Sequence, residues 1–193
     1  AEVWFADIDR NTYLLDINSV KKLIESKPKG FFKGIIPVNF AGLPVNMEEF
    51  RDLANEHDLW IIEDACHAPG GFFTDSSGLK QKCGNGNYAD LGVFSFHPVK
   101  QISAGEGGVI TTNDYNIYKR LLRLRSHGIN KLDDEYEDLN SAYTLGFNNP
   151  WYFEMRELGF HYRITDFQCA LANSQLNKIE KFLKKRRQLA KRY

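Results

Sequence analysis

The sequence predicts an α/β fold, a three-layer α/β/α arrangement around a mostly parallel sheet. Short apolar runs alternate with amphipathic stretches through roughly the first hundred residues, which is how strands and covering helices succeed one another in such folds. The chain has 193 residues, enough to bury one sizeable core. Acidic and basic side chains number 25 each, so the composition argues against nucleic acid as a partner.

The first half of the chain predicts the first strands and helices of this sheet. A strand is expected over residues 3–8, a helix over 15–26 with its apolar residues on one side, and a buried strand over 34–38. Asn46 followed by Glu49 resembles a capping box, in which the two side chains bond the first free amides of a helix.

A further strand is expected over residues 59–63, directly after the helix that Asn46 begins. Strand, helix and parallel strand in succession form a crossover unit that is right-handed in nearly all folds. The residues just after Glu63 should therefore lie at the carboxyl edge of the sheet, where α/β proteins bind ligands.

The next segment contains many glycines and polar residues, so residues 69–86 are expected to form a loop or a small hairpin. Strands are predicted over 91–96 and 108–112, with a glycine turn at 105–108. Asp114 should cap a helix that runs to about residue 126.

The last part of the chain predicts an exposed loop over 128–150 and then two helices. The first helix begins at Thr165. Its inward-facing residues are expected to be Phe167, Leu171 and Leu176. The second helix spans 177–192 and is strongly basic, which indicates a solvated face more often than a phosphate site. It stops at Tyr193 without a glycine cap or a proline, so we expect the natural chain to continue.

The cysteines and the apolar stretches of the sequence indicate the cellular compartment in which the protein is expected. Cys66, Cys83 and Cys169 are odd in number and far apart, so all three are expected to be free thiols. No stretch reaches the roughly 20 apolar residues that span a bilayer, and no signal peptide pattern opens the chain. The sequence therefore predicts a soluble cytoplasmic protein that does not associate with membranes.

The residues whose side chains could take part in catalysis or cofactor binding stand at the ends of two predicted strands. Asp64 follows one predicted strand, and Lys100 follows another, with Ser95 five residues before it. Each alone has an ordinary alternative: a loop cap for the acid, a surface charge for the lysine and a bond to a neighbouring carbonyl for the serine. Together they would lie over one sheet edge, which suits pyridoxal 5'-phosphate (PLP). That cofactor needs a lysine to hold it and an acid beside its ring nitrogen.

On these residues the sequence resembles the DegT/DnrJ/EryC1/StrS sugar aminotransferases, which have the aspartate aminotransferase-like fold type I of PLP-dependent transferases. The resemblance covers nearly the whole chain. The segment 151–166, together with His97-Pro98-Val99, resembles the subgroup that aminates UDP-4-keto-6-deoxy-N-acetylhexosamines on the pseudaminic acid route. The matching segments are 7–9, 36–38 with Gly42 and Pro44, 63–65 with 67–68, 95–96 before Lys100, 105–108, 111–114, 126–128, and 158–160 with 162–163.

The resemblance implies a role for each residue of the first group. Lys100 would hold PLP through a Schiff base and then, as the free amine, carry the proton between the substrate carbon and the cofactor. Asp64 would pair with the pyridine nitrogen, and Ser95 would bond the phosphate. His67 stands where the family has Gln or His beside the ring, although a satisfied, partly buried histidine is the alternative.

The resemblance also implies a second group of residues. His161 and Arg163 match a segment that reaches into the active site of the neighbouring subunit, where the family usually has Asn at the first position. Arg163 is a suitable ligand for an anion, and an ordinary surface ion pair is the equal alternative. Asn39 stands where the family usually has His, and it receives no role.

The function implied is transfer of an amino group from an amino acid, with glutamate the expected donor, to a nucleotide-linked keto sugar by a homodimer. Residues 1–176 would form a PLP-binding large domain truncated at both ends, and 177–193 would lead toward a small domain. The alternatives are a non-catalytic PLP- or sugar-binding relative, or an inactive fragment that binds PLP weakly.

Three other classes find less support. Lys100 argues against the dehydratase branch, which has histidine there. No G-x-G-x-x-G motif follows the first predicted strand, as nicotinamide-dependent oxidoreductases require. Asp64, Cys66 and His67 stand too close together to form an ordinary zinc site alone.

Overall fold

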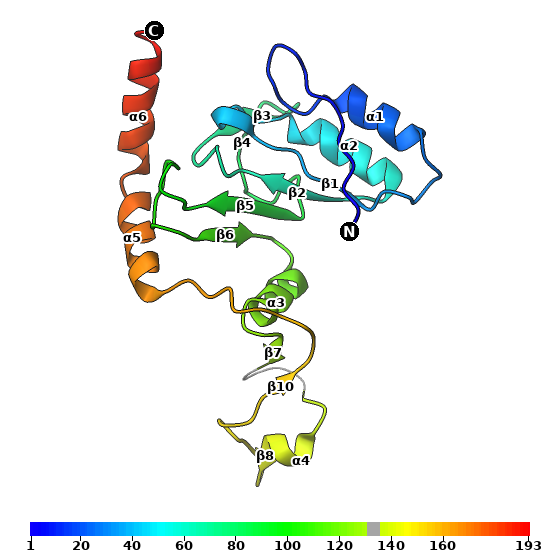
Figure 1. The fold of residues 1–193 in the computed structure, drawn as a ribbon, viewed down its shortest axis with the longest axis vertical. Coiled ribbons are helices and arrows are strands. Elements are labelled where there is room, and N and C mark those ends of the chain that lie inside the picture. Colours follow the sequence, from blue (N-terminus) through cyan, green and yellow to red (C-terminus); the bar gives the residue numbers. More distant parts are fainter. Residues whose placement is uncertain (131–135) are drawn as a thin grey trace. The chain divides into compact units, whose positions relative to one another are not determined.

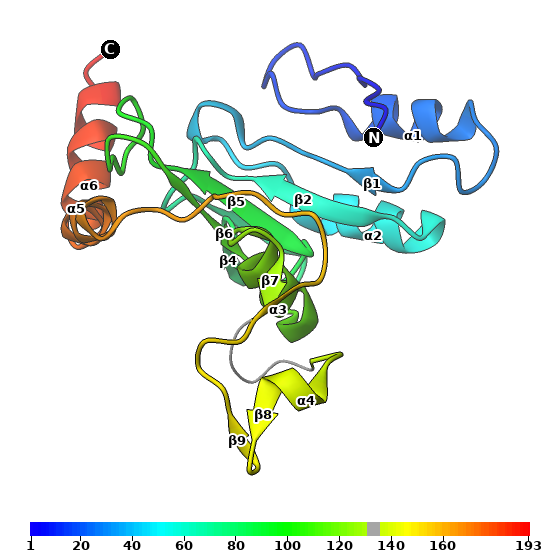
Figure 2. The same cartoon turned by 60° about the horizontal axis from the view of Figure 1, so that its bottom comes forward.

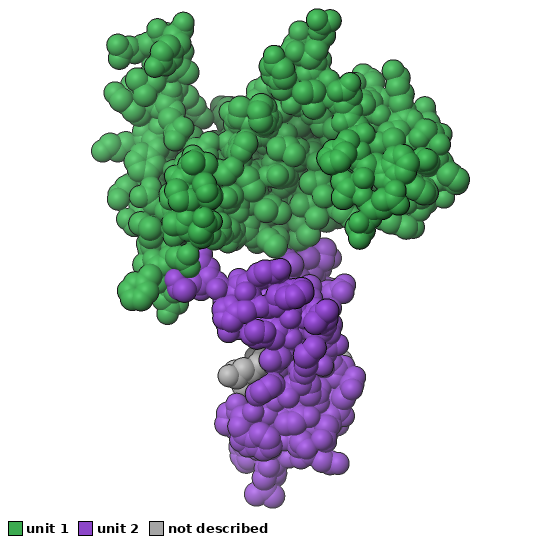
Figure 3. Space-filling view, viewed as in Figure 1, with its two compact units in different colours: residues 1–113, 166–193 green, residues 114–165 purple. Residues whose placement is uncertain are grey.

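The computed structural model describes residues 1–130 and 136–193. These residues form two compact units, which Figure 3 colours separately. The first unit comprises residues 1–113 and 166–193, and the second comprises 114–165. The expected assignment of 1–176 to cofactor binding and of 177–193 to a linking helix concerns function, and it stays a prediction.

A four-stranded sheet forms the centre of the first unit (Figure 1). Its order is β1 (Gly34–Ile35), β2 (Trp60–Asp64), β5 (Leu91–Ser95) and β6 (Gly108–Thr111). The first three strands run parallel and β6 is antiparallel to β5. The predicted mostly parallel α/β fold is confirmed, and β2 and β5 end side by side because Asp64 pairs with Val93.

Two helices pack with this sheet in one hydrophobic core. Helix α1 (Ile17–Glu25) begins at Asp16, whose carboxylate accepts from the Asn18 and Ser19 amides. Helix α2 (Met47–His57) buries the apolar residues that recur at helical spacing. The core joins both helices with β1 and β2. Its buried members are Val20, Ile35, Val45, Met47, Phe50, Leu53, Ala54, Leu59, Ile61 and Ala89.

The start of α2 differs from the predicted capping box. The Asn46 side chain makes no bond to a helix amide. Its Nδ2 instead donates to Glu49 Oε1 at 2.6 Å. The two side chains satisfy each other, so the reciprocal bonds to the backbone that define the box are not formed.

Two predicted strands differ from the structure. Residues 3–8 form no strand: Val3 and Phe5 are exposed, and only Ile8 makes a single bridge, to Leu15. Apolar residues alone do not make a strand without a hydrogen-bonded partner along their length. The strand predicted over 34–38 stops at Ile35, because Pro37 has no amide to continue the ladder.

The connection between β2 and β5 forms the small hairpin that the sequence predicted. Strands β3 (Phe72–Thr74) and β4 (Lys80–Lys82) pair antiparallel. The Cys83 amide donates to the Gly71 carbonyl at 3.0 Å and closes the hairpin at its base. All three cysteines are free thiols, as expected.

Helices α5 (Asp166–Leu176) and α6 (Ile179–Ala190) end the chain and lie beside the β5–β6 end of the sheet in both views (Figures 1 and 2). The prediction that Phe167, Leu171 and Leu176 face inward is wrong, because all three are exposed. A different face of helix α5 packs against the rest of the unit. Gln168 donates to the Glu106 carbonyl at 3.1 Å and Ala172 is buried.

The second unit begins with α3 (Tyr115–Leu124), which Asp114 caps as predicted. Strands β7 (Ile129–Asn130) and β10 (Glu154–Met155) pair antiparallel. A single-turn helix α4 (Leu139–Ala142) precedes the hairpin of β8 (Tyr143–Thr144) and β9 (Phe147–Asn148).

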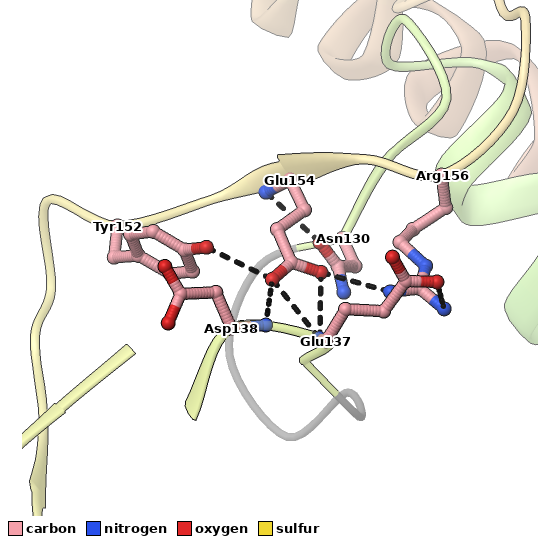
Figure 4. Close-up of polar contacts among 6 residues, drawn as sticks. All are labelled: Asn130, Glu137, Asp138, Tyr152, Glu154 and Arg156. Atoms are coloured by element: carbon pink, nitrogen blue, oxygen red, sulfur yellow. Dashed lines mark hydrogen bonds and ion pairs between the residues drawn. The ribbon is translucent and has the colours of Figure 1, made fainter. Parts of the chain in front are cut away.

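The expectation of an exposed loop over 128–150 is partly right: most of its described residues are exposed, but the segment contains β7, α4, β8 and β9 instead of a plain loop, and residues 131–135 lie outside the described part. Figure 4 shows the reason. The Glu154 carboxylate accepts from the amides of Glu137 and Asp138 and from the Tyr152 hydroxyl. These bonds, led by that of the Glu137 amide, lower the pKa of Glu154 to about 2. One carboxylate thus organises a segment that has little apolar patterning.

Candidate active site

Asp64 is the last residue of β2, and the local backbone fixes it on both sides. Its amide donates to the Pro37 carbonyl, and its own carbonyl accepts from the Asn39 amide, each at 2.9 Å. The carboxylate accepts from the Cys66 amide at 3.0 Å, which holds it at the start of the turn after the strand. The side chain is half-buried, so a carboxylate stands at the sheet edge with its orientation set.

His67 lies three residues beyond Asp64 and is held at both of its polar ends. Its ring Nδ1 accepts from the Ala41 amide at 3.3 Å. Its backbone carbonyl accepts from the Gln101 side chain at 2.7 Å. The Phe40 ring lies 5.8 Å from the imidazole, centroid to centroid.

Ser95 ends β5, and Lys100 follows in a turn. The Ser95 hydroxyl accepts from the His97 amide at 3.3 Å, which differs from the alternative of a bond to a neighbouring carbonyl. The Lys100 amide donates to the His97 carbonyl at 2.9 Å, and the Ala104 amide donates to the Phe96 carbonyl at the same distance. Lys100 is half-buried.

The turn that carries Lys100 closes onto β6 at a glycine. A Cβ atom on Gly108 would lie 2.6 Å from the Phe94 carbonyl oxygen, which is closer than real Cβ contacts. The Phe96 amide donates to the Gly107 carbonyl at 2.8 Å. The glycines of the predicted 105–108 turn thus let the chain return closely enough to pair with β5.

The structure brings Asp64, His67, Ser95 and Lys100 to one sheet edge. Gln101 ties the Lys100 turn to His67. Burial raises the pKa of the Cys66 thiol to about 11, and the Asp64 carboxylate adds to the increase while the Lys100 charge opposes it. The charges of Lys100 and Asp64 therefore both influence the Cys66 thiol, which lies near them.

His161 and Arg163 lie in the second unit, and both are exposed. His161 makes a backbone bridge with Ser126, and its ring lies 5.4 Å from that of His127. These contacts explain the position of the histidine within its own unit. The roles predicted for the two residues toward a neighbouring subunit stay predictions.

A buried polar cluster of Asn39 and Glu63 adjoins Asp64, and it was not predicted from the sequence. Asn39 and Glu63 are 0% and 4% exposed. Asn39 Nδ2 donates to Glu63 Oε1 at 2.8 Å, and the Gly84 amide donates to the other carboxylate oxygen at 2.9 Å. Burial raises the pKa of Glu63, and the Gly84, Asn39 and Cys83 donors oppose the increase.

The sequence held one sign of this cluster: Glu63 is a charged residue at the end of a predicted strand, and a buried acid needs partners. Nothing in the sequence around Asn39 indicated the cluster, because its partner Glu63 is far away along the chain. In the described part of the chain no group of three or more His, Cys, Asp or Glu could hold a metal ion. No described helix is both long and apolar enough to span a membrane.

Known proteins are similar to this chain in sequence and in fold. The model of the DegT/DnrJ/EryC1/StrS aminotransferase family matches residues 1–193. An uncharacterized protein of Methanocaldococcus jannaschii, MJ1066, is 36% identical over 189 residues, which are 98% of this chain and 44% of that protein. A Campylobacter jejuni protein named UDP-4-amino-4,6-dideoxy-N-acetyl-beta-L-altrosamine transaminase is 33% identical over 193 residues, which are 100% of this chain and 45% of that protein.

Solved structures of the same family have a similar fold. Helicobacter pylori PseC, an aminotransferase involved in pseudoaminic acid biosynthesis, superposes with a TM-score of 0.71 at 30% identity, over 92% of this chain and 40% of that one. A DegT DnrJ EryC1 StrS aminotransferase from Brucella abortus gives 0.75 at 25% identity, over 98% and 45%. The chain spans less than half the length of these relatives. Because the family model matches every residue and the shared fold extends over nearly all of them, the chain belongs to the DegT/DnrJ/EryC1/StrS aminotransferase family.

Proposed function

We propose that the protein is a PLP-dependent aminotransferase that moves an amino group from an amino acid, glutamate by preference, to a nucleotide-linked keto sugar. The observation that carries the proposal is the position of Asp64 and Lys100: Asp64 ends β2, which is paired with β5, and Lys100 lies in the turn after β5, where its neighbour Gln101 bonds the His67 carbonyl. The name of the Campylobacter relative supports a nucleotide-linked sugar as the substrate class, and that of the Helicobacter relative supports a role in pseudaminic acid biosynthesis.

The residues at this edge fit PLP in their chemistry. The cofactor presents a ring nitrogen that needs an acid, an aldehyde that needs a primary amine, and two oxygen-bearing groups that need donors. Asp64, Lys100, His67 and Ser95 offer one partner of each kind. None of the four is fully buried, so a ligand has access to them.

When bound, PLP supplies an electron sink for the carbon that gains or loses the amino group. Asp64 would keep the ring nitrogen protonated, because a carboxylate held by the Cys66 amide accepts from it in a fixed direction. Lys100 would hold the cofactor, and its released amine would carry a proton at the reacting carbon. His67 would donate to a ring oxygen and Ser95 to the phosphate.

We further propose a homodimer in which His161 and Arg163 reach the neighbouring active site. The second unit supports this with many exposed apolar side chains, which a neighbouring subunit could cover. Its exposed members are Tyr143, Leu145, Phe147, Trp151, Phe153, Met155, Leu158, Phe160 and Tyr162. Sedimentation of the intact protein at micromolar concentration tests the dimer, and a monomer with full activity would contradict it.

The remaining assignments are proposals of the same kind. Residues 1–176 would bind the cofactor, 177–193 would lead to a small domain, and the protein would work in the cytoplasm. The 193-residue chain by itself is expected to bind PLP weakly or not at all. An absorbance titration with PLP tests this, and tight stoichiometric binding would contradict it.

Lys100→Ala in the intact protein tests the central assignment. The variant should lose turnover and the yellow colour of the bound cofactor while it keeps its fold. Lys178→Ala is the control, because the ammonium of that lysine bonds Ser174 in α5 and its loss should leave turnover unchanged.

Borohydride reduction of the wild type followed by peptide mass spectrometry should find the cofactor on Lys100 and on none of the lysines of 178–191. Label on another lysine, or near-normal turnover of Lys100→Ala, would overturn the assignment. Cofactor binding without any turnover by the wild type, across amino acids and keto sugars, would favour the non-catalytic alternative.

A further inference from the structure

We propose that Asn39 and Ala41 are positioning residues that hold His67 in the tautomer with its proton on Nε2, so that the ring meets its ligand as a hydrogen-bond donor. The identity of that ligand, an oxygen of PLP, rests on the proposed function. The tautomer itself does not.

The contact at the ring decides which nitrogen has the proton. A backbone amide can only donate, and the Ala41 amide lies 3.3 Å from His67 Nδ1. Nδ1 must therefore offer its lone pair, and in a neutral imidazole the proton is then on Nε2. An imidazolium would place a second N–H against the Ala41 amide and lose this bond.

The Ala41 amide points at the ring because the backbone adopts an unusual conformation. Ala41 has φ 52° and ψ 20°, in the left-handed region that costs free energy for a residue with a Cβ. It lies in the short 3-10 helix η1 (Phe40–Gly42). Such a conformation persists only where neighbouring contacts impose it.

Asn39 supplies those contacts at the start of η1. Its backbone amide donates to the Asp64 carbonyl at 2.9 Å, and its side-chain Oδ1 accepts from the Val45 amide at 3.0 Å. Its Nδ2 donates to buried Glu63 at 2.8 Å. This one residue therefore bonds the chain beyond η1 and the end of β2, and fixes the path of the backbone through Ala41.

The backbone of His67 is held independently of its ring. The Gln101 side chain donates to the His67 carbonyl at 2.7 Å, from the residue next to Lys100. With the carbonyl and Nδ1 both engaged, Nε2–H is the donor that the half-buried ring offers to a ligand. An oxygen acceptor is the chemical class that it would take, and the oxygens of PLP belong to it.

The test is a long-range proton–nitrogen NMR correlation on the intact protein with its histidines labelled with nitrogen-15, which distinguishes the two neutral tautomers. His67→Gln identifies the signal by its loss. The wild type should show the Nε2–H tautomer for His67 with or without PLP. Asn39→Ala should give a mixture of tautomers, because Ala41 is then free to leave the left-handed region.

Two control variants keep the test decisive. Ala41→Gly retains the amide and permits the same conformation, so the tautomer should remain. The paired change Asn39→Asp with Glu63→Gln reverses the direction of the buried bond and should also retain it. An Nδ1–H signal in the wild type, or an unchanged tautomer in folded Asn39→Ala, would overturn the inference.

The ligand is tested separately from the tautomer. His67→Gln, whose amide can replace Nε2–H as a donor, should bind PLP within a few-fold of the wild type, whereas His67→Leu should bind it at least about tenfold more weakly. If the wild type shows the Nε2–H tautomer but binds no PLP, the positioning role stands and the proposed function fails. Equal binding by the Gln and Leu variants would refute the donor role.

Discussion

Replacing Glu63 by glutamine is a sharp perturbation of the structure, because it removes one acceptor from a cluster in which each partner is fixed. Both carboxylate oxygens of Glu63 accept, one from Asn39 Nδ2 and one from the Gly84 amide. Glutamine must turn an NH₂ group toward one of these donors. Asn39 cannot rotate its amide in response, since its own oxygen accepts from the Val45 amide.

The magnitude follows from the donor that is left without a partner. A buried donor without an acceptor costs about 1–3 kcal/mol. Burial already raises the pKa of Glu63, so its ionised form is a net cost near neutral pH. Removal of that charge offsets part of the loss, and we expect a net destabilisation of about 1–2 kcal/mol. In a protein of this size that lowers Tm by roughly 2–8 °C.

The matched control is the double variant Asn39→Asp with Glu63→Gln. It keeps one charge in the cluster and returns every donor to an acceptor, because the introduced amide would donate to the introduced carboxylate and accept from the Gly84 amide. Urea unfolding should place the double variant within about 1 kcal/mol of the wild type. Additive losses from the two changes, or a Glu63→Gln protein as stable as the wild type, would refute this account of the cluster.

Three further outcomes are expected. Because the pKa of Glu154 is lowered to about 2 from a usual value near 4.5, its stabilisation is present above 4.5 and is lost as pH falls toward 2. The difference in urea midpoint between the wild type and Glu154→Gln should therefore shrink in acid. Gly128→Ala should destabilise by more than about 3 kcal/mol, because a Cβ there would overlap the Glu157 carbonyl at φ 70°. Gly146→Ala, at φ 81° in open space, should cost only about 1–2 kcal/mol in the same unfolding assay. Iodoacetamide should alkylate Cys66 slowly at neutral pH, with a rate that rises toward its pKa of about 11. Fast labelling of this peptide, followed by mass spectrometry, would contradict the raised pKa of this half-buried thiol.

Local chemistry predicted those elements whose causes are local. Asp114 caps its helix as predicted, through amides two and three residues ahead, and the apolar spacing of α2 matches its buried face. The sheet edge that holds the candidate site was predictable for a similar reason. The carboxyl ends of parallel strands lie at the same edge of a sheet, so Asp64 and Lys100 were expected near each other.

The errors arose where a distant partner decides the outcome. Residues 3–8 have the composition of a strand but almost no ladder to join. Phe167 and Leu171 share a helix face, yet the packed face is that of Gln168 and Ala172. Asn39 was given no role because it stands where the resembling family usually has His, and nothing near it in the sequence shows that a buried carboxylate lies beside it.

The hairpin of β3 and β4 also bears on the order in which the chain folds. Before β5 can pair with β2, the chain must close the whole connection between them, and the entropy lost grows with the length of that loop. A hairpin forms from neighbouring residues within microseconds. Once the Cys83 amide has bonded the Gly71 carbonyl at its base, the hairpin shortens the loop and delivers the Gly84 amide to Glu63. We therefore expect early formation of the hairpin to reduce the entropy that is lost when β5 pairs with β2.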